Sequence, residues 1–506
     1  MTRVVSLREV EEHPSSGADS NGFLFELEGE LFRAVSGHGL GVVEKLLDDG
    51  TIGSLCDRLL LVPTRRADLS IEGYPLVVWH EKLPIVSYPS EWSFGMLKKA
   101  ALLLVDLEEA LVPLDLSVHD AHPWNVLYRW TRPLMVDLGA IMPVADTSLW
   151  NEADRHPLWP AYNQFRTTFF NPLRMMSWGQ TRIARALLRD YLGASDAETD
   201  RMSPAWQARL RLAAGDLKRQ ATRHLRAGAR KTFPPRVLRL GQRFFQALRS
   251  EVPQAAQPLL PERRQRLRFL AAVKAHLSDL DYGPVLGGGT SYIGGQQDRT
   301  KYYEELHGGA VPDLTSTAGW TAKNHTVASL LDRCQPRIVL DIGCSTGWYS
   351  RLAARKGAGV VACDSDEGCV EELFLTCTRE GSPILPLLID FRSPTPGVGP
   401  TNRWLRPATE RLRADLVLML ALVHHLVFKQ SMTFQQIVET LRLTSRRWAI
   451  CEFIPPTDTW VRDLFGPRFS WYTLDSFLDC LRGAFDKLEC FPSFPEGRTL
   501  IFCERS

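Results

Sequence analysis

Short apolar runs alternate with amphipathic segments from residue 330 to the end of the chain. Strands are expected at the apolar runs, 337–341, 359–364, 384–390, 415–420 and 448–452. Helices are expected where apolar residues recur at helical spacing, at 349–356, 366–379 and 432–443. Two late runs, 488–491 and 499–503, predict a hairpin that closes an otherwise parallel sheet. The alternation predicts an α/β fold with a Rossmann-like, doubly wound sheet.

The first half of the chain has a different pattern. From Phe23 to Val78, short apolar runs alternate with turn residues, which is typical of a small β-rich lobe. Residues 92–111 have helical spacing, and two compact strand-like runs follow at 126–128 and 134–137. Residues 150–280 are rich in Leu, Ala and Arg and predict helices. We therefore expect an α+β region whose second lobe is helical.

The length and the local composition suggest how the chain is divided. A chain of 506 residues is long enough for several domains. Its polar start predicts a disordered lead-in over residues 1–20, and the glycine-rich stretch 287–295 predicts a linker over 256–300. The remaining parts, 21–255 and 301–506, are the two expected domains.

Charge and cysteine usage exclude several classes of protein. The net charge is +2, no run approaches the roughly 18 apolar residues of a membrane span, and the start lacks the apolar core of a signal peptide. We therefore expect a cytoplasmic protein without a membrane partner. The ten cysteines form no CxxC pair, so no metal site is expected. Nothing in the sequence indicates the oligomeric state.

The loop after the first C-terminal strand carries the strongest chemical signal. It reads Asp341-Ile-Gly-Cys-Ser-Thr-Gly347 and leads into a helix, whose free N–H groups would face a ligand. Gly343 lets the backbone pass close to that ligand. The loop lacks the Lys-Ser or Lys-Thr of a triphosphate loop and the GxGxxG turn of a dinucleotide site. A nicotinamide dinucleotide is the weaker alternative to a ligand with an amino-acid end, whose ammonium would lie near Asp341.

Two further acids end the next strands. Asp364 ends the second strand, where a carboxylate accepts hydrogen bonds from both ribose hydroxyls of a bound nucleoside. Asp390 ends the third strand and is expected to accept the exocyclic amine of adenine. The three acids at successive strand ends are more specific than any of them alone, and together they predict an adenosyl ligand.

These motifs resemble those of class I S-adenosylmethionine-dependent methyltransferases, over roughly residues 300–506. The matching segments are 339–350, Val361-Ala-Cys-Asp364, Leu388-Ile-Asp390 and Leu420-Ala-Leu-Val-His-His-Leu426. The resemblance implies S-adenosylmethionine as cofactor, with Leu420 and Ala421 beside the reactive sulfonium. The cofactor-binding residues that we predict are Asp341, Gly343, Cys344, Ser345, Gly347, Asp364, Asp390, Leu420 and Ala421.

Methyl transfer needs positioning, and a base if the acceptor must lose a proton. His424 and His425 follow the fourth strand and are the first candidates, because an ordinary imidazole has a pKa near neutrality. The alternative is that one histidine packs and the other caps a helix. Glu452, at the end of the fifth strand, is the other candidate base.

The loop His119-Asp-Ala-His-Pro-Trp-Asn125 and the later Asp137-Leu-Gly139 carry a second pattern. Asp120, Asn125 and Asp137 have the offsets of a phosphotransfer site, and they resemble the kinase-like enzymes of the aminoglycoside and choline kinase type. A glycine-rich phosphate loop is missing before residue 60, and Arg33 stands where a lysine is expected. We therefore expect a degenerate kinase-like fold that acts as scaffold or binds substrate, and this argues against Mg-ATP as a ligand.

The combination extends the resemblance over most of the chain. With His80-Glu-Lys-Leu-Pro84 and Tyr88-Pro-Ser-Glu-Trp92 added, the sequence resembles bacterial nodulation-protein-like methyltransferases. We expect the acceptor to be a small molecule or a carrier-bound metabolite. Three alternatives stay open: a bifunctional enzyme that also phosphorylates, an RNA-directed methyltransferase, and a non-catalytic binding protein. Residues 201–250 carry thirteen Lys or Arg against one acid, but they have few aromatics for base stacking, so nucleic acid is not the expected partner.

Overall fold

The computed structural model describes residues 3–16, 22–147, 154–189, 191–204, 263–283, 312–402 and 404–505. The chain separates into two units. The first contains Met1–Lys99, Val126–Val136 and Gly287–Ser506, and the second contains Ala100–Asn125 and Asp137–Leu286. The domain boundaries expected near 255 and 300 lie outside the described residues and stay a prediction. The glycine-rich stretch 287–295 and most of the basic stretch 201–250 also lie outside the described residues.

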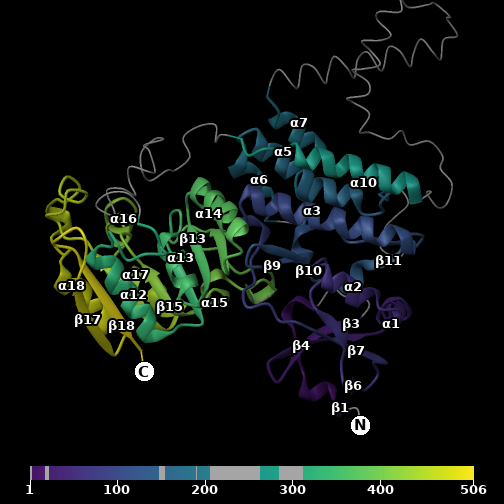
Figure 1. Cartoon of the computed structure of the whole chain (residues 1–506), viewed down its shortest axis with the longest axis horizontal. Coiled ribbons are helices and arrows are strands. Elements are labelled where there is room, and N and C mark those ends of the chain that lie inside the picture. The colour runs from purple at the N-terminus through teal and green to yellow at the C-terminus, as the bar shows by residue number, and fades with distance from the viewer. Residues whose placement is uncertain are drawn as a thin grey trace, which may run out of the picture. The chain divides into compact units, whose positions relative to one another are not determined.

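Seven strands of the first unit form one sheet in the order β14-β13-β12-β15-β16-β18-β17 (Figure 1). The strands from β14 to β16 pair in parallel, whereas β18 is antiparallel to both of its neighbours. This arrangement confirms the predicted doubly wound sheet and its closing hairpin. The bounds are β12 (Ile338–Ile342), β13 (Gly359–Asp364), β14 (Ile384–Leu388), β15 (Ala414–Met419), β16 (Ser445–Phe453), β17 (Lys487–Pro492) and β18 (Thr499–Glu504).

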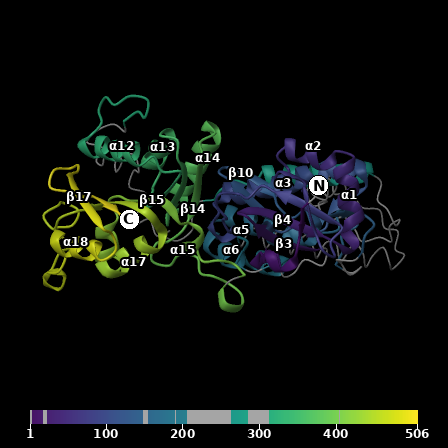
Figure 2. The same ribbon diagram turned by 90° about the horizontal axis from the view of Figure 1, so that it is seen from below.

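Helices cover both faces of this sheet (Figure 2). On one face lie α12 (Ala322–Cys334), α13 (Trp348–Arg355) and α14 (Glu367–Glu380). On the other lie α15 (Ala408–Arg411), α17 (Phe434–Thr444) and α18 (Leu474–Arg482). The helix α17 starts at a capping box between Thr433 and Gln436 and buries the predicted apolar stripe, which includes Phe434 and Leu441. A short helix after β15, α16 (Val423–Phe428), was not expected separately.

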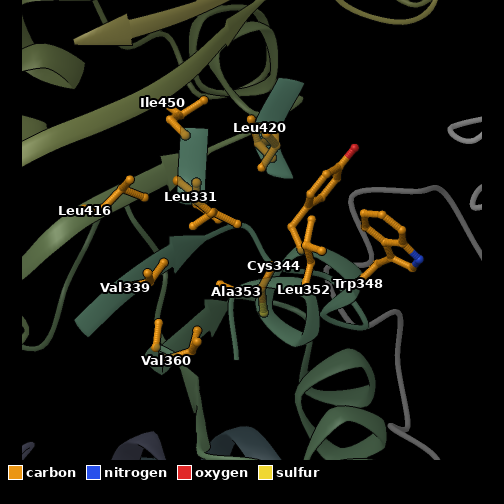
Figure 3. Close-up of a cluster of buried hydrophobic side chains, with 14 of the residues drawn as sticks. Leu331, Val339, Cys344, Trp348, Leu352, Ala353, Val360, Leu416, Leu420 and Ile450 are labelled. Carbon is orange, nitrogen blue, oxygen red and sulfur yellow. The ribbon is translucent and has the colours of Figure 1, made fainter. Parts of the chain in front are cut away.

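The apolar core of the sheet extends to the strand ends. Figure 3 shows Leu331 of α12 and Leu352 of α13 in one cluster with residues of β12 and β15. Burial of each such side chain stabilises the fold by about 1.5–3 kcal/mol. Cys344 and Leu420, from the loops after β12 and β15, belong to the same cluster. Both loops are therefore packed onto the core rather than loosely attached to it.

The N-terminal part of the first unit is the predicted β-rich lobe. Its five strands have the order β2-β3-β4-β7-β5, and they are β2 (Glu11–Glu12), β3 (Gly22–Leu27), β4 (Glu30–Val35), β5 (Thr64–Arg66) and β7 (Leu76–His80). Two helices, α1 (Leu40–Asp48) and α2 (Thr51–Asp57), connect β4 to β5. A two-residue turn of Glu28 and Gly29, both at positive φ, joins β3 to β4.

The expected disordered lead-in is wrong for residues 3–16. Strand β1 (Arg3–Val5) pairs in parallel with β6 (Leu69–Ile71), and Val5 is buried. A capping box between Ser6 and Glu9 then starts a short 3-10 turn. The polar composition of this segment hid the backbone pairing, which does not depend on side-chain polarity.

The second unit is mainly helical in the part that the structure describes, as predicted. Most of α3 (Phe94–Leu111) belongs to it, and the other helical segments are α4 (Tyr162–Phe165), a π-helix (Arg166–Phe170), α5 (Asn171–Ser177), α6 (Thr181–Leu187), α7 (Asp196–Met202) and α10 (Arg263–Ser278). Strand β8 (Leu116–Val118) pairs with β11 (Ile141–Pro143), and in the first unit β9 (Val126–Arg129) pairs with β10 (Arg132–Met135). Arg266 and Glu108 form a buried ion pair at 2.7 Å between α10 and α3. The structure thus contains an α/β sheet domain, and its N-terminal half contains α+β elements. The kinase-like character of these α+β elements stays a prediction.

Candidate cofactor site

The loop between β12 and α13 turns sharply at the carboxyl edge of the sheet. Gly343, Ser345 and Gly347 all have positive φ, of 74°, 49° and 79°. The N–H groups of Gly343 and Cys344 donate to the carbonyl of Cys363 at 2.8 and 3.1 Å. The loop is thereby fixed to the end of β13, next to Asp364.

Of the two glycines in this loop, Gly347 leaves less room for a side chain than Gly343 does. It is the N-cap of α13, and a Cβ there would lie 2.5 Å from Cδ1 of Leu373. The left-handed backbone and the close neighbour both require glycine. The first turn of α13 therefore leaves backbone N–H groups at the site, as the sequence predicts.

Asp364 fixes this loop by accepting backbone hydrogen bonds. Ser345 N–H donates to Oδ2 and Asp366 N–H donates to Oδ1, each at 2.8 Å. Burial raises the pKa of Asp364, while these hydrogen bonds oppose the rise. The side chain of Asp364 is half-buried at the strand end. Each of its oxygens can accept a further hydrogen bond from a ligand's hydroxyl.

Asp341 is buried beneath the same loop. Ser350 Oγ, on α13, donates to its Oδ2 at 2.6 Å. Burial raises the pKa of Asp341 to about 6, and the nearby charge of Asp364 adds to the rise. A cation at this position would favour the ionised carboxylate. Asp341 is therefore suited to the ammonium end of a ligand.

Asp390 lies two residues beyond β14 at the same edge. The N–H of Ile389 donates to the carbonyl of Asp364 at 2.9 Å, which places Asp390 near the end of β13. Its carboxylate accepts the N–H of Arg392 at 2.9 Å and pairs with the Arg392 guanidinium at 3.2 Å. Its expected contact with adenine stays a prediction.

The loop after β15 is hydrogen-bonded to the buried carboxylate of Glu452. Ala421 has a φ of 50°, and its N–H donates to Oε2 of Glu452 at 2.8 Å. Lys323 Nζ also binds Oε2, at 2.6 Å, and Ser493 Oγ donates to Oε1 at 2.6 Å. Because both oxygens of Glu452 are occupied and the residue is fully buried, the geometry argues against its expected role as base.

His424 and His425 lie on α16, with ring centroids 4.0 Å apart. Burial lowers the pKa of His424 well below its ordinary value, and it lowers the pKa of His425 to about 4. The expectation of a pKa near neutrality is therefore wrong for both residues. The sequence places them correctly after β15 but does not reveal how deeply α16 buries them.

In the second unit, Asp120 and Asn125 come together as predicted. Asn125 Nδ2 donates to Oδ2 of Asp120 at 3.1 Å, and Gln164 Nε2 donates to Oδ1 at 2.7 Å. His122 Nε2 lies 3.2 Å from Oδ2. Burial alone would raise the pKa of Asp120, but these three hydrogen bonds outweigh it and lower the pKa.

Asp137 begins a short turn close to this loop. Its Oδ1 accepts the N–H of Gly139 at 3.1 Å. The His119 N–H donates to the carbonyl of Ala140 at 2.8 Å, so the turn runs beside the Asp120 loop. Within the described ranges, no cluster of three His, Cys, Asp or Glu side chains is suited to a metal ion.

Sequence reasoning missed four polar residues of the site. They are Lys323, Asn324, Ser350 and Ser493. Ser350 could have been found, since it lies nine residues after Asp341 on the helix that the loop opens. Lys323 and Ser493 reach Glu452 across 129 and 41 residues, and no local pattern signals contacts at that separation.

Comparison with known proteins adds one relative along nearly the whole chain. No family model matches this sequence. The nodulation protein NoeA of Rhizobium meliloti (strain 1021) is 25% identical over 472 residues, which cover 92% of this chain and 90% of NoeA. The chain is thus similar to NoeA along most of its length. The predicted resemblance to a nodulation protein is thereby confirmed.

Solved structures of low similarity were also found. The bifunctional kinase-methyltransferase WbdD is 15% identical, covering 40% of this chain and 41% of WbdD, with a TM-score of 0.29. The chain thus spans less than half of the length of WbdD. Magnesium protoporphyrin IX methyltransferase (ChlM) from Synechocystis PCC 6803, with bound SAH, is 19% identical, covering 36% of this chain and 81% of ChlM, with a TM-score of 0.27. In the part of the chain that the structure describes, no helix has the length and apolar character needed to cross a bilayer.

Proposed function

We propose that this chain is a methyltransferase that uses S-adenosylmethionine (SAM), held at the carboxyl edge of the seven-stranded sheet. The observation that carries the proposal is that Asp341 and Asp364 lie on either side of one loop. The loop residue Ser345 donates its backbone N–H to Asp364, and Ser350 on the following helix donates to Asp341. A buried carboxylate with a raised pKa suits the donor's ammonium, and a half-buried carboxylate at the next strand suits its ribose.

The sheet supports the same assignment. Its strand order, with one reversed strand inserted beside the fifth, is that of the class I methyltransferases which the sequence resembles. In an open α/β sheet the ligand lies beyond the carboxyl ends of the strands, where the strand order changes direction. Here that point lies between β12 and β15, which carry the loops with Gly343 and Ala421.

Bound SAM would supply a methyl group activated by its sulfonium. The chain's own residues would orient the donor and exclude water, since displacement at the methyl carbon depends mainly on alignment. A neutral, buried His424 is suited to accept a hydrogen bond from the acceptor rather than to act as a strong base. Its Nδ1 has no hydrogen-bond partner among the described residues.

The acceptor is proposed to be a small molecule or a carrier-bound metabolite. The kinase-like part would then act as scaffold or bind substrate, because the oxygens of Asp120 are already occupied by Asn125, Gln164 and His122. No described residue provides a specific reason to prefer RNA as the acceptor.

Isothermal titration with SAM and with S-adenosylhomocysteine (SAH) tests the proposal. The intact chain is expected to bind both, Asp364→Ala is expected to lose both, and Asp137→Ala is expected to bind both normally. Absence of binding to the intact chain would overturn the proposal, and so would equal binding by Asp364→Ala.

A further inference from the structure

A buried polar network links the first turn of α12 to both loops of the proposed cofactor site. Lys323 and Asn324 are the second and third residues of α12, and they are 1% and 0% exposed. The large majority of polar side chains buried at this depth are hydrogen-bonded or paired. Lys323 binds Glu452 on β16, and Asn324 binds Tyr349 on α13.

Lys323 acts on the loop after β15 through Glu452. Its Nζ and the N–H of Ala421 both bind Oε2 of Glu452, at 2.6 and 2.8 Å. Ala421 is not glycine yet has left-handed φ, a conformation that costs roughly 1–2 kcal/mol and persists only when neighbouring structure enforces it. The hydrogen bond to the Glu452 carboxylate stabilises Ala421 in this conformation.

Asn324 contacts the start of α13, the helix that follows the other loop, through Tyr349. The Tyr349 hydroxyl donates to Oδ1 of Asn324 at 2.7 Å. Tyr349 is the second residue of α13, the helix that Gly347 opens. Lys323 Nζ also lies 5.3 Å from the centre of the Tyr349 ring. The start of α12 therefore contacts both α13 and the support of Ala421.

Stability alone does not explain a buried ion pair at this position. Apolar residues of similar volume often replace such a pair at no cost in stability, so its presence suggests that it fixes geometry or charge. The resemblance places Ala421 beside the sulfonium. The opposite charges of Lys323 and Glu452 would fix the position of the loop at Ala421. They would also determine the electrostatic potential next to the sulfonium.

We propose that Lys323 and Glu452 are positioning residues, which hold the loop at Ala421 and balance the charge next to the donor's sulfonium. The inference rests on the proposed function, since it concerns the same donor. Lys323 and Glu452 touch no reacting atom in this account. They act through the backbone of Ala421 and through their charges.

The test compares affinities for SAM, which carries the sulfonium charge, with affinities for the uncharged thioether SAH. Glu452→Gln keeps an acceptor for the Ala421 N–H but leaves the Lys323 cation unbalanced, so SAM should lose affinity relative to SAH. Lys323→Met leaves the carboxylate unbalanced, so the SAM-to-SAH ratio should change in the opposite direction. Each change is expected to be about threefold to tenfold. The double variant should return the ratio close to that of the unmodified chain.

A matched control is available in another buried ion pair, that of Arg266 and Glu108. Glu108→Gln breaks its pair with Arg266, and both residues are as buried as Lys323 and Glu452. It should lower the melting temperature without changing the SAM-to-SAH ratio. A ratio that changes in the same direction in both test variants, or that stays constant in both, would overturn the inference. If the unmodified chain binds neither ligand, the proposed function itself fails.

Discussion

The backbone N–H of Ser345 donates to Oδ2 of Asp364 at 2.8 Å, across the gap between two adjacent strand ends. Ser345 has a φ of 49°, in the left-handed region that residues with a Cβ rarely adopt. The same relation occurs at Ala421, whose N–H donates to Glu452. Two non-glycine residues with left-handed backbone thus border the proposed site, and a carboxylate accepts the N–H of each. Such conformations often occur at functional sites.

Replacement of Asp364 by Asn should weaken donor binding much more than it weakens the fold. The amide still accepts one hydrogen bond, but it loses the charge that Ser345, Asp366 and the ribose hydroxyls would share. We expect the affinities for SAM and SAH to fall by roughly tenfold or more, as for loss of a charged hydrogen bond. Asp366→Asn, which keeps the cap of α14, is the control, and its affinity by isothermal titration should remain near normal. Normal affinity in Asp364→Asn would contradict the assignment.

Gly347→Ala should destabilise the first unit more than Gly357→Ala does. Both glycines have positive φ, so both substitutions introduce backbone strain of about 1 kcal/mol. At Gly347 the new Cβ would also lie 2.5 Å from Leu373, whereas at Gly357 it meets nothing within 4 Å. The difference between the two, measured by urea unfolding, isolates the steric cost, which we expect to be about 1–3 kcal/mol. Equal effects would show that the loop relaxes freely.

The raised pKa of Asp341 predicts opposite effects on stability and on binding. Its pKa in the folded chain is about 6, above the ordinary aspartate value of 3.8, so the folded state resists ionisation. Its favourable contribution is present below the unfolded pKa and is lost as pH rises through about 6. The free energy of unfolding is expected to fall by about 3 kcal/mol over this pH range. Asp341→Asn should therefore stabilise the ligand-free chain at about pH 8 but not at about pH 4.

Donor binding should depend on pH in the reverse sense. A cationic ligand needs the ionised carboxylate of Asp341, so SAM affinity should rise as pH increases through about 6. Asp341→Asn should bind SAM weakly at every pH and lose this dependence. Calorimetry in buffers of different ionisation enthalpy would also detect the proton released on binding below that pKa. A pH-independent affinity of the unmodified chain would show that Asp341 does not face the donor.

The sequence predicts the parts of the site that lie on strands. Asp341 and Asp364 end apolar runs whose length and period identify them as strands, and adjacent parallel strands bring their carboxyl ends together. The contacts of Glu452 were beyond prediction, because Lys323 and Ser493 approach it from distant segments. The depth of burial of His424 was also hidden, since α16 is too short to show a clear period. Local order can thus be inferred from pattern, while tertiary burial decides which polar groups stay reactive.

The two histidines should remain neutral throughout the physiological range. Burial lowers the pKa of His425 to about 4 and the pKa of His424 well below its ordinary value, so neither ring should titrate between about pH 5 and 8. Imidazole resonances in a carbon-13 NMR titration, assigned with His424→Gln and His425→Gln, would check this. A midpoint near the ordinary histidine value in the ligand-free chain would restore the sequence-based interpretation of either residue as a general base.

The domain predicted to be kinase-like should not bind Mg-ATP with an affinity better than about 1 mM. Oδ1 of Asp120 accepts from Gln164 and Oδ2 accepts from Asn125, so the two residues expected to serve the acceptor and the metal bind each other. In the first unit, the turn between β3 and β4 has two residues, one of them Glu28, whose charge would repel a phosphate. Asp120→Ala should cost about 1–3 kcal/mol of stability, because it leaves buried donors unpaired.

Titration with ATP in the presence of magnesium, and a phosphate-release assay, would check this expectation. SAM titrated into the same preparation serves as the positive control, because it reports that the chain is folded. Asp120→Ala and Asp137→Ala should match the unmodified chain in both ATP assays and should retain SAM binding. Magnesium-dependent ATP turnover that disappears in Asp120→Ala would instead establish a second activity, because Asp120 would then have to exchange its hydrogen bonds from Gln164 and Asn125 for a contact with the phosphate acceptor.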